Sequence, residues 1–132
     1  TMLLLTSDRT GETLLLSQIE RSDALPKTEL LQGTLDLLIL KILALGPNHG
    51  WGISNRIKQI SKDGLCASQG SLYPALHRLE MRGHIRSEMA PSENNRRARI
   101  YTLTATGQRQ LQSETESWEH FALSMSRVLR ST

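Results

Sequence analysis

The chain has 132 residues, of which 38% are hydrophobic and 22% are charged, and such a composition suits a single folded domain. Its apolar runs, such as residues 37–40, are far shorter than the roughly 20 residues that cross a bilayer. The first residues lack the basic start and the length of a signal peptide. One cysteine, Cys66, excludes a disulfide framework and a thiolate metal cluster. We therefore expect a cytoplasmic protein with no metal and no cofactor.

The net charge of +3 is small, but it is distributed unevenly along the chain. Residues 1–40 carry three basic and six acidic side chains, whereas residues 41–68 carry four basic and one acidic. Residues 69–103 carry six arginines and three glutamates, and residues 104–132 are balanced at three against three. Positive charge in the middle of the chain is what phosphate contacts need, because releasing counterions supplies most of the non-specific affinity for DNA. Many solvated surfaces share this charge, so it does not decide the function alone.

Residues 1–26 form an N-terminal extension in our interpretation. Four apolar side chains between residues 12 and 19 predict a short helix, and Pro26 disfavours helix at the residue before it. Two readings stay open for this segment. It is an appendage with no activity of its own, or it takes part in contacts between two copies of the chain.

Two apolar helices are predicted next. The first covers residues 27–45, or begins at Gly33-Thr34 with Thr34 as its cap, and it ends at Gly46-Pro47. It is too apolar for a surface helix, so we expect it to cross the centre of the domain. The second covers residues 50–60, and its inner side is expected to carry Ile53, Ile57 and Ile60.

Three residues around the second helix have alternative roles. His49 lies in a predicted tight turn, as a turn or cap residue and not a catalytic one, because no nucleophile or carboxylate stands near it. Trp51 is expected in the core, and a small-molecule pocket is the alternative. Residues 65–67 predict a short strand that pairs with a later hairpin, with Cys66 buried in it.

The stretch from residue 69 to residue 103 changes its periodicity at Gly83. Before Gly83 the apolar positions follow helical spacing; after it, apolar and polar residues alternate around a polar, arginine-rich tip. The helical positions are Leu72, Ala75, Leu76 and Leu79. A helix followed by two strands around a basic tip is typical of a winged helix. The predicted fold is therefore mainly α with a small β-hairpin (α+β), divided into an extension (1–26), a winged-helix domain (27–104) and a C-terminal helix (105–132).

In such a domain the third helix enters the major groove through its N-terminal part. Either Ser68 or Ser71 caps this helix, and the choice decides how deep Pro74 lies in it. The candidate DNA-binding residues on the helix are Gln69, Ser71, Tyr73, His77 and Arg78. The candidates at the hairpin tip are Asn94, Asn95, Arg96 and Arg97. For each, a phosphate contact and direct base reading both stay open.

The last helix carries a broad apolar seam, which predicts a homodimer with coiled-coil-like contacts. The candidate dimer residues are Leu111, Trp118, Phe121, Ala122, Met125 and Leu129. Docking of the helix on its own domain is the alternative. A dimer would present two reading helices to successive major-groove faces and would suit a palindromic site.

Four motifs in order resemble the PadR family of bacterial transcriptional regulators. They are L-L-Q-G-T-L-D-L-L-I-L-K-I-L (30–43), H-G-W-G-I-S-N-R-I (49–57), G-S-L-Y-P-A-L-H-R-L-E-M-R-G-H-I (70–85) and E-N-N-R-R-A-R-I-Y-T-L-T (93–104). The resemblance implies a homodimeric winged-helix repressor of the short subclass, with the reading helix at residues 69–82 and the wing tip at residues 94–97. Trp51 stands where the family usually has tyrosine, and the first 25 or so residues have no counterpart in a typical short member.

The resemblance also implies a small aromatic effector in some members, and Trp118 stands where a flat ligand would stack, with Trp51 as a second candidate. The alternative for Trp118 is a place in the dimer core. Another class of function is a winged-helix protein-interaction module without DNA, because fold alone does not decide function. An enzyme is not expected, since the sequence has no phosphate-binding glycine loop, metal-ligand spacing or nucleophile–base arrangement.

Overall fold

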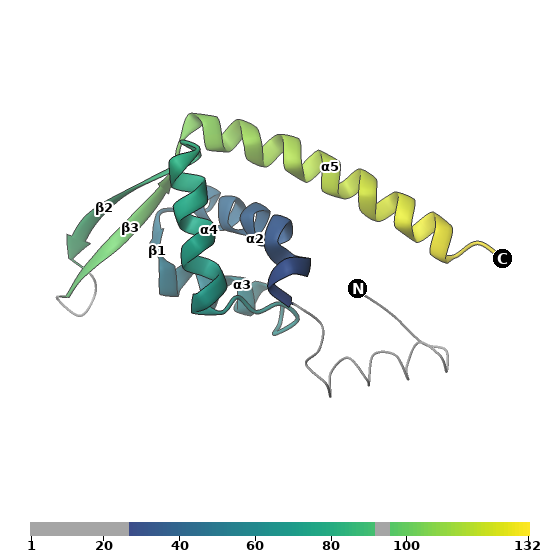
Figure 1. Ribbon diagram of the computed structural model, residues 1–132, viewed down its shortest axis with the longest axis horizontal. Helices are drawn as coiled ribbons and strands as arrows, with labels where there is room; N and C mark the ends of the chain where they lie inside the picture. The colour runs from purple at the N-terminus through teal and green to yellow at the C-terminus, as the bar shows by residue number, and fades with distance from the viewer. Residues whose placement is uncertain (1–26, 92–95) are drawn as a thin grey trace. The chain divides into compact units, whose positions relative to one another are not determined.

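The computed structural model describes residues 27–91 and 96–132. The described elements are, in chain order, α2 (Lys27–Ala44), β1 (Asn48–His49), α3 (Gly50–Ile60), α4 (Gln69–Met81), β2 (Ile85–Pro91), β3 (Arg97–Leu103) and α5 (Ala105–Leu129) (Figure 1). The three strands form one antiparallel sheet in the order β1-β3-β2. The predicted class, mainly α with a small hairpin, is confirmed. The predicted helix within residues 12–19 and the tip residues Asn94 and Asn95 lie outside the described residues.

The core belongs to the unit formed by residues 35–132. Buried apolar side chains from α2, α3 and α4 meet there, and Ile85 of β2, Tyr101 of β3 and Leu111 of α5 complete the core. Its members are Leu35, Ile39, Leu40, Ile42, Leu43, Ile53, Ile57, Leu72, Ala75, Leu76, Leu79, Ile85, Tyr101 and Leu111. In the described part of the chain, no helix has the length and hydropathy of a membrane span.

The first predicted helix is present as α2 and ends one residue earlier than expected. It passes through Gly33 and Thr34 without interruption, so the alternative start with Thr34 as cap is wrong. The end follows the sequence signal closely. Gly46 adopts a φ of 150° that a side chain would disfavour, and its N–H bonds the Leu43 carbonyl.

The strand that joins the hairpin is Asn48–His49, and the predicted strand at residues 65–67 is wrong. Asn48 pairs with Tyr101, and His49 pairs with Ile100. At the other segment, the Leu65 N–H donates to Ser61 Oγ (2.9 Å), and the Ala67 carbonyl accepts from Ser54 Oγ (2.8 Å). Side chains of α3 and its C-cap therefore bond backbone groups that a strand ladder would need.

Three burial predictions near α3 are also wrong. Trp51 is 63% exposed and Ile60 is 53% exposed, because the inner side of this short helix is completed by Gly50, Ile53 and Ile57. Cys66 is exposed, in the irregular segment before α4. The prediction for His49 is confirmed: it is the N-cap of α3, and its Nδ1 accepts the Gly52 N–H at 2.9 Å.

The wing is the hairpin of β2 and β3. Directly opposed residues share a face of the hairpin, so the register from Ile85↔Leu103 to Pro91↔Arg97 defines two faces. The face that holds Ile85 and Tyr101 packs on the core and is buried at its base. Tyr101 and Leu103 therefore attach the wing to the domain.

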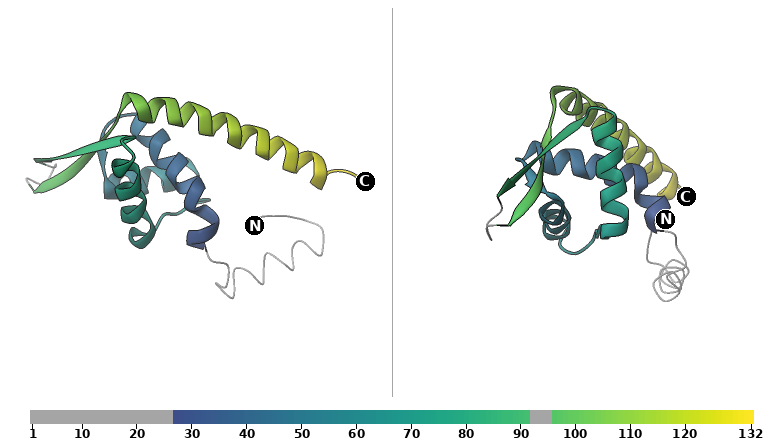
Figure 2. Two further views of the ribbon diagram at one scale, coloured as in Figure 1. Left: turned by 45° about the horizontal axis from the view of Figure 1, so that its top comes forward. Right: turned by 60° about the vertical axis from the view of Figure 1, so that its left-hand side comes forward.

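Helix α5 begins against the base of the wing. Thr104 caps it by accepting the Gly107 N–H (3.0 Å), and the Thr104 hydroxyl donates to the Gly83 carbonyl (2.7 Å). A Cβ on Gly107 would lie 2.0 Å from the His84 carbonyl oxygen, so only glycine allows this approach. From there α5 leads away from the sheet (Figure 2).

Candidate nucleic-acid interface

The N-terminus of α4 is fixed by Ser68, which decides between the two predicted caps. Its Oγ accepts the Ser71 N–H at 3.2 Å, and its carbonyl accepts the Leu72 N–H at 2.8 Å. Pro74 then lies in the second turn of the helix, deeper than a Ser71 cap would place it. Ser71 is half-buried and its Oγ accepts from the Ser68 hydroxyl (3.2 Å), so this predicted site residue is part of the cap.

Three of the predicted site residues form an exposed stripe on α4. Gln69, Tyr73 and His77 follow one another at steps of four, and all three are exposed. Tyr73 lies against the start of α3, where its Oη would be 2.8 Å from a Cβ on Gly50. The glycine therefore leaves the space in which the tyrosine ring rests. These side chains offer an amide, a phenol and an imidazole, which are groups that bond phosphates or base edges.

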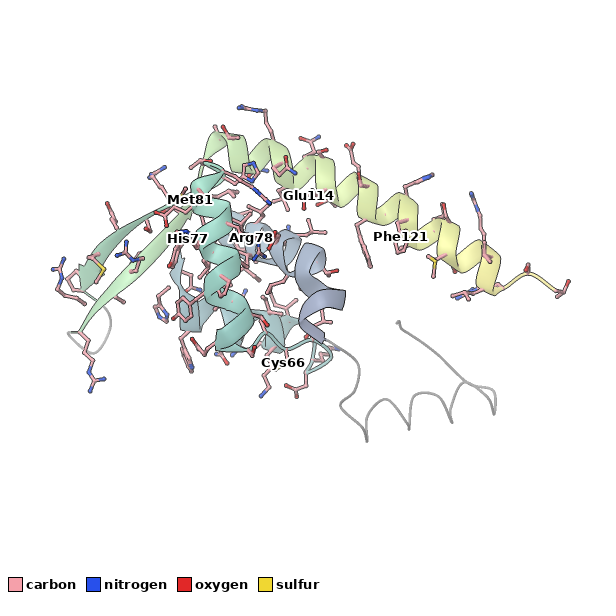
Figure 3. All side chains as sticks on the ribbon, viewed as in Figure 1. Cys66, His77, Arg78, Met81, Glu114 and Phe121 are labelled. Atoms are coloured by element: carbon pink, nitrogen blue, oxygen red, sulfur yellow. The ribbon has the colours of Figure 1, made fainter. Side chains whose placement is uncertain are left out.

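Arg78 has a different environment from its neighbour His77. Its guanidinium donates to Asp36 Oδ1 at 3.0 Å, and its side chain is only 29% exposed. Figure 3 shows His77 and Arg78 leaving α4 on different sides. The ion pair therefore ties α4 to α2 and directs Arg78 toward the interior of the domain.

Asp36 is the buried charge of this region. Arg82 approaches its second carboxylate oxygen at 3.8 Å. Burial raises the pKa of the Asp36 carboxyl above its ordinary value, while Arg78 and Arg82 lower it and Glu114 of α5 raises it further. Desolvation thus outweighs the two cations. Sequence reasoning missed this residue, although a carboxylate within an otherwise apolar run is a signal of a buried ion pair.

The wing contributes the cations of the candidate site. Arg96 and Arg97 are exposed, and Arg97 begins β3 on the face that leads down to the core. Arg99 is exposed on the same face, nearer to the core. Arg86 lies on the opposite face, paired with Thr102. Two of the wing's arginines therefore follow one face.

Sequence reasoning also missed a chain of hydrogen bonds between α4 and the wing. The Ser87 hydroxyl donates to Glu80 Oε2 at 2.7 Å, and Arg99 Nη1 donates to Ser87 Oγ at 3.1 Å. These hydrogen bonds connect the last turn of α4 with both strands of the hairpin. The alternation of Arg97, Arg99 and Tyr101 along β3 was the sequence signal that could have placed Arg99 on the face of the wing that packs on the core.

The two tryptophans considered for an effector lie on different elements. Trp51, at the start of α3, stacks on His49 with ring centroids 6.3 Å apart. Trp118, in the middle of α5, lies beside Phe121 with centroids 5.7 Å apart. Among the described residues, no group of His, Cys, Asp and Glu side chains is arranged to hold a metal ion.

The predicted dimer seam is largely exposed on α5. Trp118 is 46% exposed, Phe121 53%, Met125 41% and Leu129 73%. Leu111 differs from the other predicted dimer residues. It is 6% exposed in the core of its own chain and is not available to a partner. Ala122 is half-buried. Leu123 and Val128 on the same helix are exposed as well.

Comparison with known proteins identifies relatives of this arrangement. The profile of the transcriptional regulator PadR-like family matches residues 39–113. A transcriptional regulator from Clostridium thermocellum superposes with a TM-score of 0.68 at 27% identity, covering 75% of this chain and 96% of the other. A PadR family transcriptional regulator from Eggerthella lenta superposes with a TM-score of 0.69 at 26% identity, covering 90% and 99%.

A curated relative is much longer than this chain. It is an uncharacterised 37.1 kDa protein in transposon TN4556 of Streptomyces fradiae, 41% identical over 81 residues. The match covers 61% of this chain and 22% of that protein. The chain therefore corresponds to about a fifth of this relative.

Proposed function

This chain belongs to the PadR-like family of transcriptional regulators, and we propose that it binds a palindromic operator as a homodimer and represses transcription from it. The observation that carries the proposal is the surface formed by α4 and the wing. Exposed Gln69, Tyr73 and His77 lie on the helix, and exposed arginines lie on the hairpin beside it. We assign the helix to the major groove and the wing to the neighbouring backbone or minor groove.

Within this site we separate residues that touch DNA from residues that hold the helix. Gln69, Tyr73, His77, Arg96 and Arg97 are assigned to DNA, with Asn94 and Asn95 as further tip contacts. Ser71 and Arg78 are assigned to the support of α4, because Ser71 belongs to the cap and Arg78 bonds Asp36. The outward side of α4 therefore presents Gln69, Tyr73 and His77, whereas Glu80 is half-buried and accepts the Ser87 hydroxyl.

The alternative, a protein-interaction module, would be favoured by an acidic outer side of α4. The exposed residues of α4 and its C-cap include His77 and Arg82 and no carboxylate, and the profile match is to regulators of transcription. Both observations support DNA as the partner.

Titration of the protein with fragments of its own upstream region tests the proposal directly. We expect saturable binding whose affinity falls steeply as salt increases, because phosphate neutralisation releases counterions. An inverted repeat protected from cleavage in a footprint would support two-fold binding. Affinity that is absent, or that does not respond to salt, would remove DNA as the partner.

The wing is tested by Arg96→Ala combined with Arg97→Ala. Binding should weaken on every duplex, and the salt slope should fall by about 0.9 for each phosphate that the variant no longer neutralises. The matched control is Arg127→Ala combined with Arg130→Ala, which removes two exposed cations from the far end of α5. An equal loss of affinity in both double variants would indicate a general charge effect and not an interaction of the wing.

The homodimer is tested on α5 by Trp118→Ala. Loss of a large aromatic from an interface centre typically costs about 2 kcal/mol or more, roughly a thirty-fold weaker association. Sedimentation equilibrium measures it. Trp51→Ala is the matched control, because it removes the same side chain from an exposed site outside the seam. If the two variants associate equally well, Trp118 is not part of the interface.

We further propose that a small aromatic effector releases the protein from its operator. The exposed pair of Trp118 and Phe121 offers a stacking surface. In a Trp51→Phe background, fluorescence reports Trp118 alone. We expect flat aromatic compounds that quench this signal to lower operator affinity as well; quenching without any change in affinity would contradict a role in release.

A further inference from the structure

The hydrogen bonds between α4 and the wing lie where the hairpin leaves the core. Ile85 and Tyr101 are 2% and 6% exposed, and they hold the base of the hairpin by apolar packing. Further out on the same face, Met89 is 43% exposed, and Arg99 is opposite to it. Beyond the base, apolar packing no longer orients the hairpin, so the orientation of Arg99 depends on polar contacts.

Ser87 supplies that contact because of its register. It is opposite Tyr101 and half-buried, on the same face as Arg99 and next to the last turn of α4. Its hydroxyl donates to the Glu80 carboxylate at 2.7 Å, and its oxygen accepts from Arg99 Nη1 at 3.1 Å. A hydroxyl polarised by a carboxylate is a better acceptor, so the two bonds strengthen each other.

Arg99 also lies beside the reading helix. Its guanidinium is joined through Ser87 to Glu80 in the last turn of α4, and it lies on the same face of β3 as the buried Tyr101. The bond to Ser87 uses one of the five N–H donors of a guanidinium. The other donors form a planar fork, which fits a phosphate in a bidentate manner.

We propose that Arg99 is a DNA-contacting residue of this regulator, and that Ser87 and Glu80 are positioning residues that hold its guanidinium between the wing and α4. Its partner is a phosphate of the duplex next to the segment that α4 reads. This rests on the proposed function, because it requires DNA on the surface of α4 and the wing. It adds a residue between the tip and the helix, so that the cationic surface continues from Arg97 to the reading helix.

The hairpin offers a charge-matched control for this proposal. Arg86 is exposed on the opposite face of the same strands, where it pairs with Thr102. Arg86→Ala and Arg99→Ala therefore remove the same side chain from the same hairpin. They differ in the face that loses its charge.

The experiment measures the affinity of the full chain for a fluorescent mixed-sequence duplex of about 30 base pairs, roughly three helical turns, over a series of salt concentrations. Arg99→Ala should weaken binding about ten-fold at low salt and reduce the salt slope by about 0.9 per chain bound. Arg86→Ala should leave the salt slope the same, within error, as that of the unsubstituted chain. Equal slopes for both variants would overturn the assignment of Arg99.

Ser87 is tested by a pair of substitutions that differ in the hydroxyl. Ser87→Ala should weaken binding about five-fold, the effect of one hydrogen bond, whereas Ser87→Thr keeps the hydroxyl and should restore most of the affinity. Thermal melting of each variant reports whether it is folded. Because positioning acts through Arg99, Ser87→Ala should have no further effect in an Arg99→Ala background. An undiminished effect in that background would contradict the positioning role.

The two levels of the proposal fail in different ways. A parent protein that binds no duplex, or binds without salt dependence, removes the proposed function itself. A parent that binds with the expected salt dependence, while Arg99→Ala behaves like Arg86→Ala, removes only the role of Arg99.

Discussion

Helices α4 and α5 have similar apolar spacing but different ways of covering it. In α4, Leu72, Leu76 and Leu79 are at most 1% exposed, because α2, α3 and the wing enclose them. In α5, Leu111 is buried near the start, whereas the seam from Trp118 to Leu129 is at least 41% exposed at its large apolar side chains. The apolar side of α4 is covered by its own chain, while the apolar side of α5 beyond Leu111 is exposed, which agrees with the proposed homodimer.

This difference separates two functions of a hydrophobic stripe. The stripe of α4 fixes the helix so that its opposite side can present polar groups at defined positions. The stripe of α5 is left exposed by its own domain, and in the proposed homodimer a second copy of the chain would cover it. The same periodicity therefore predicts a helix in both cases, and only the surroundings decide between core and interface.

The largest effect should come from removing a leucine of α4. Leu76→Ala should lower the free energy of unfolding by about 3 kcal/mol, because it leaves a cavity in an enclosed site. Leu129→Ala makes the same change at a side chain that is 73% exposed. We expect its effect to depend on protein concentration and that of Leu76→Ala to be independent of it, measured by urea unfolding at several concentrations. Equal, concentration-independent losses of stability would contradict the difference between the two helices.

The next effect concerns the one place where α5 is held tightly. Gly107→Ala should cost about 2 kcal/mol, because its Cβ would overlap the His84 carbonyl and force a backbone shift. Gly33→Ala is the matched control, since no atom within 4 Å would meet its Cβ and it lies within α2. There the substitution should be neutral or stabilising. Thermal melting distinguishes the two, and a tolerated alanine at Gly107 would mean that the start of α5 is not fixed.

The two residues of the ion pair between α4 and α2 should differ in how much stability is lost when each is replaced. Arg78→Met leaves the Asp36 carboxylate, 12% exposed, without its main cation and should cost about 1.5 kcal/mol at neutral pH. Asp36→Asn should cost less, because the Arg78 side chain retains access to water. Chemical denaturation of both variants at pH 7 measures the difference. A larger loss in Asp36→Asn would contradict the view that the buried carboxylate is the vulnerable partner.

The pH dependence of this pair has a definite sign. Burial raises the pKa of Asp36 above 3.8 in the folded chain, so the folded state holds this proton more tightly than the unfolded state. Its contribution to stability is therefore fully present below the unfolded pKa and is lost as pH rises through the folded pKa. Arg78→Met removes the main influence that lowers this pKa. The deficit of that variant should shrink as the pH is lowered from neutral toward the unfolded value.

The smallest effects should come from the two N-caps. Ser68→Ala removes one bond to the Ser71 N–H and should cost about 0.7 kcal/mol. Thr104→Ala removes the bond from the Gly107 N–H and also the bond to the Gly83 carbonyl, and should cost about 1 kcal/mol. If α4 enters DNA as proposed, Ser68→Ala should in addition lower DNA affinity, because it loosens the first turn of this helix. A larger stability loss at Ser68 would reverse the ranking of the two caps.

Elements with strong local signals could be predicted from the amino-acid sequence without further information. Steps of three and four predicted α2, α3, α4 and α5, and alternation predicted the wing, because both periodicities arise within a few neighbouring residues. Gly46-Pro47 and Gly83 marked two ends for the same local reason. The exposed stripe of Gln69, Tyr73 and His77 follows from spacing alone, once Leu72 and Leu76 face the core.

The pairing of distant groups, by contrast, depends on the tertiary structure. Asp36 and Arg78 are separated by 42 positions, so no local pattern distinguishes an arginine that bonds a buried carboxylate from one that faces DNA. The strand that pairs with the wing is β1 (Asn48–His49) and not residues 65–67, because side chains of α3 and its C-cap bond residues 65 and 67. Trp51 was expected in the core and is exposed, whereas Leu111 was expected at a dimer contact and is buried in its own domain. Apolarity favours burial, but the space left by other elements decides which apolar side chains are buried.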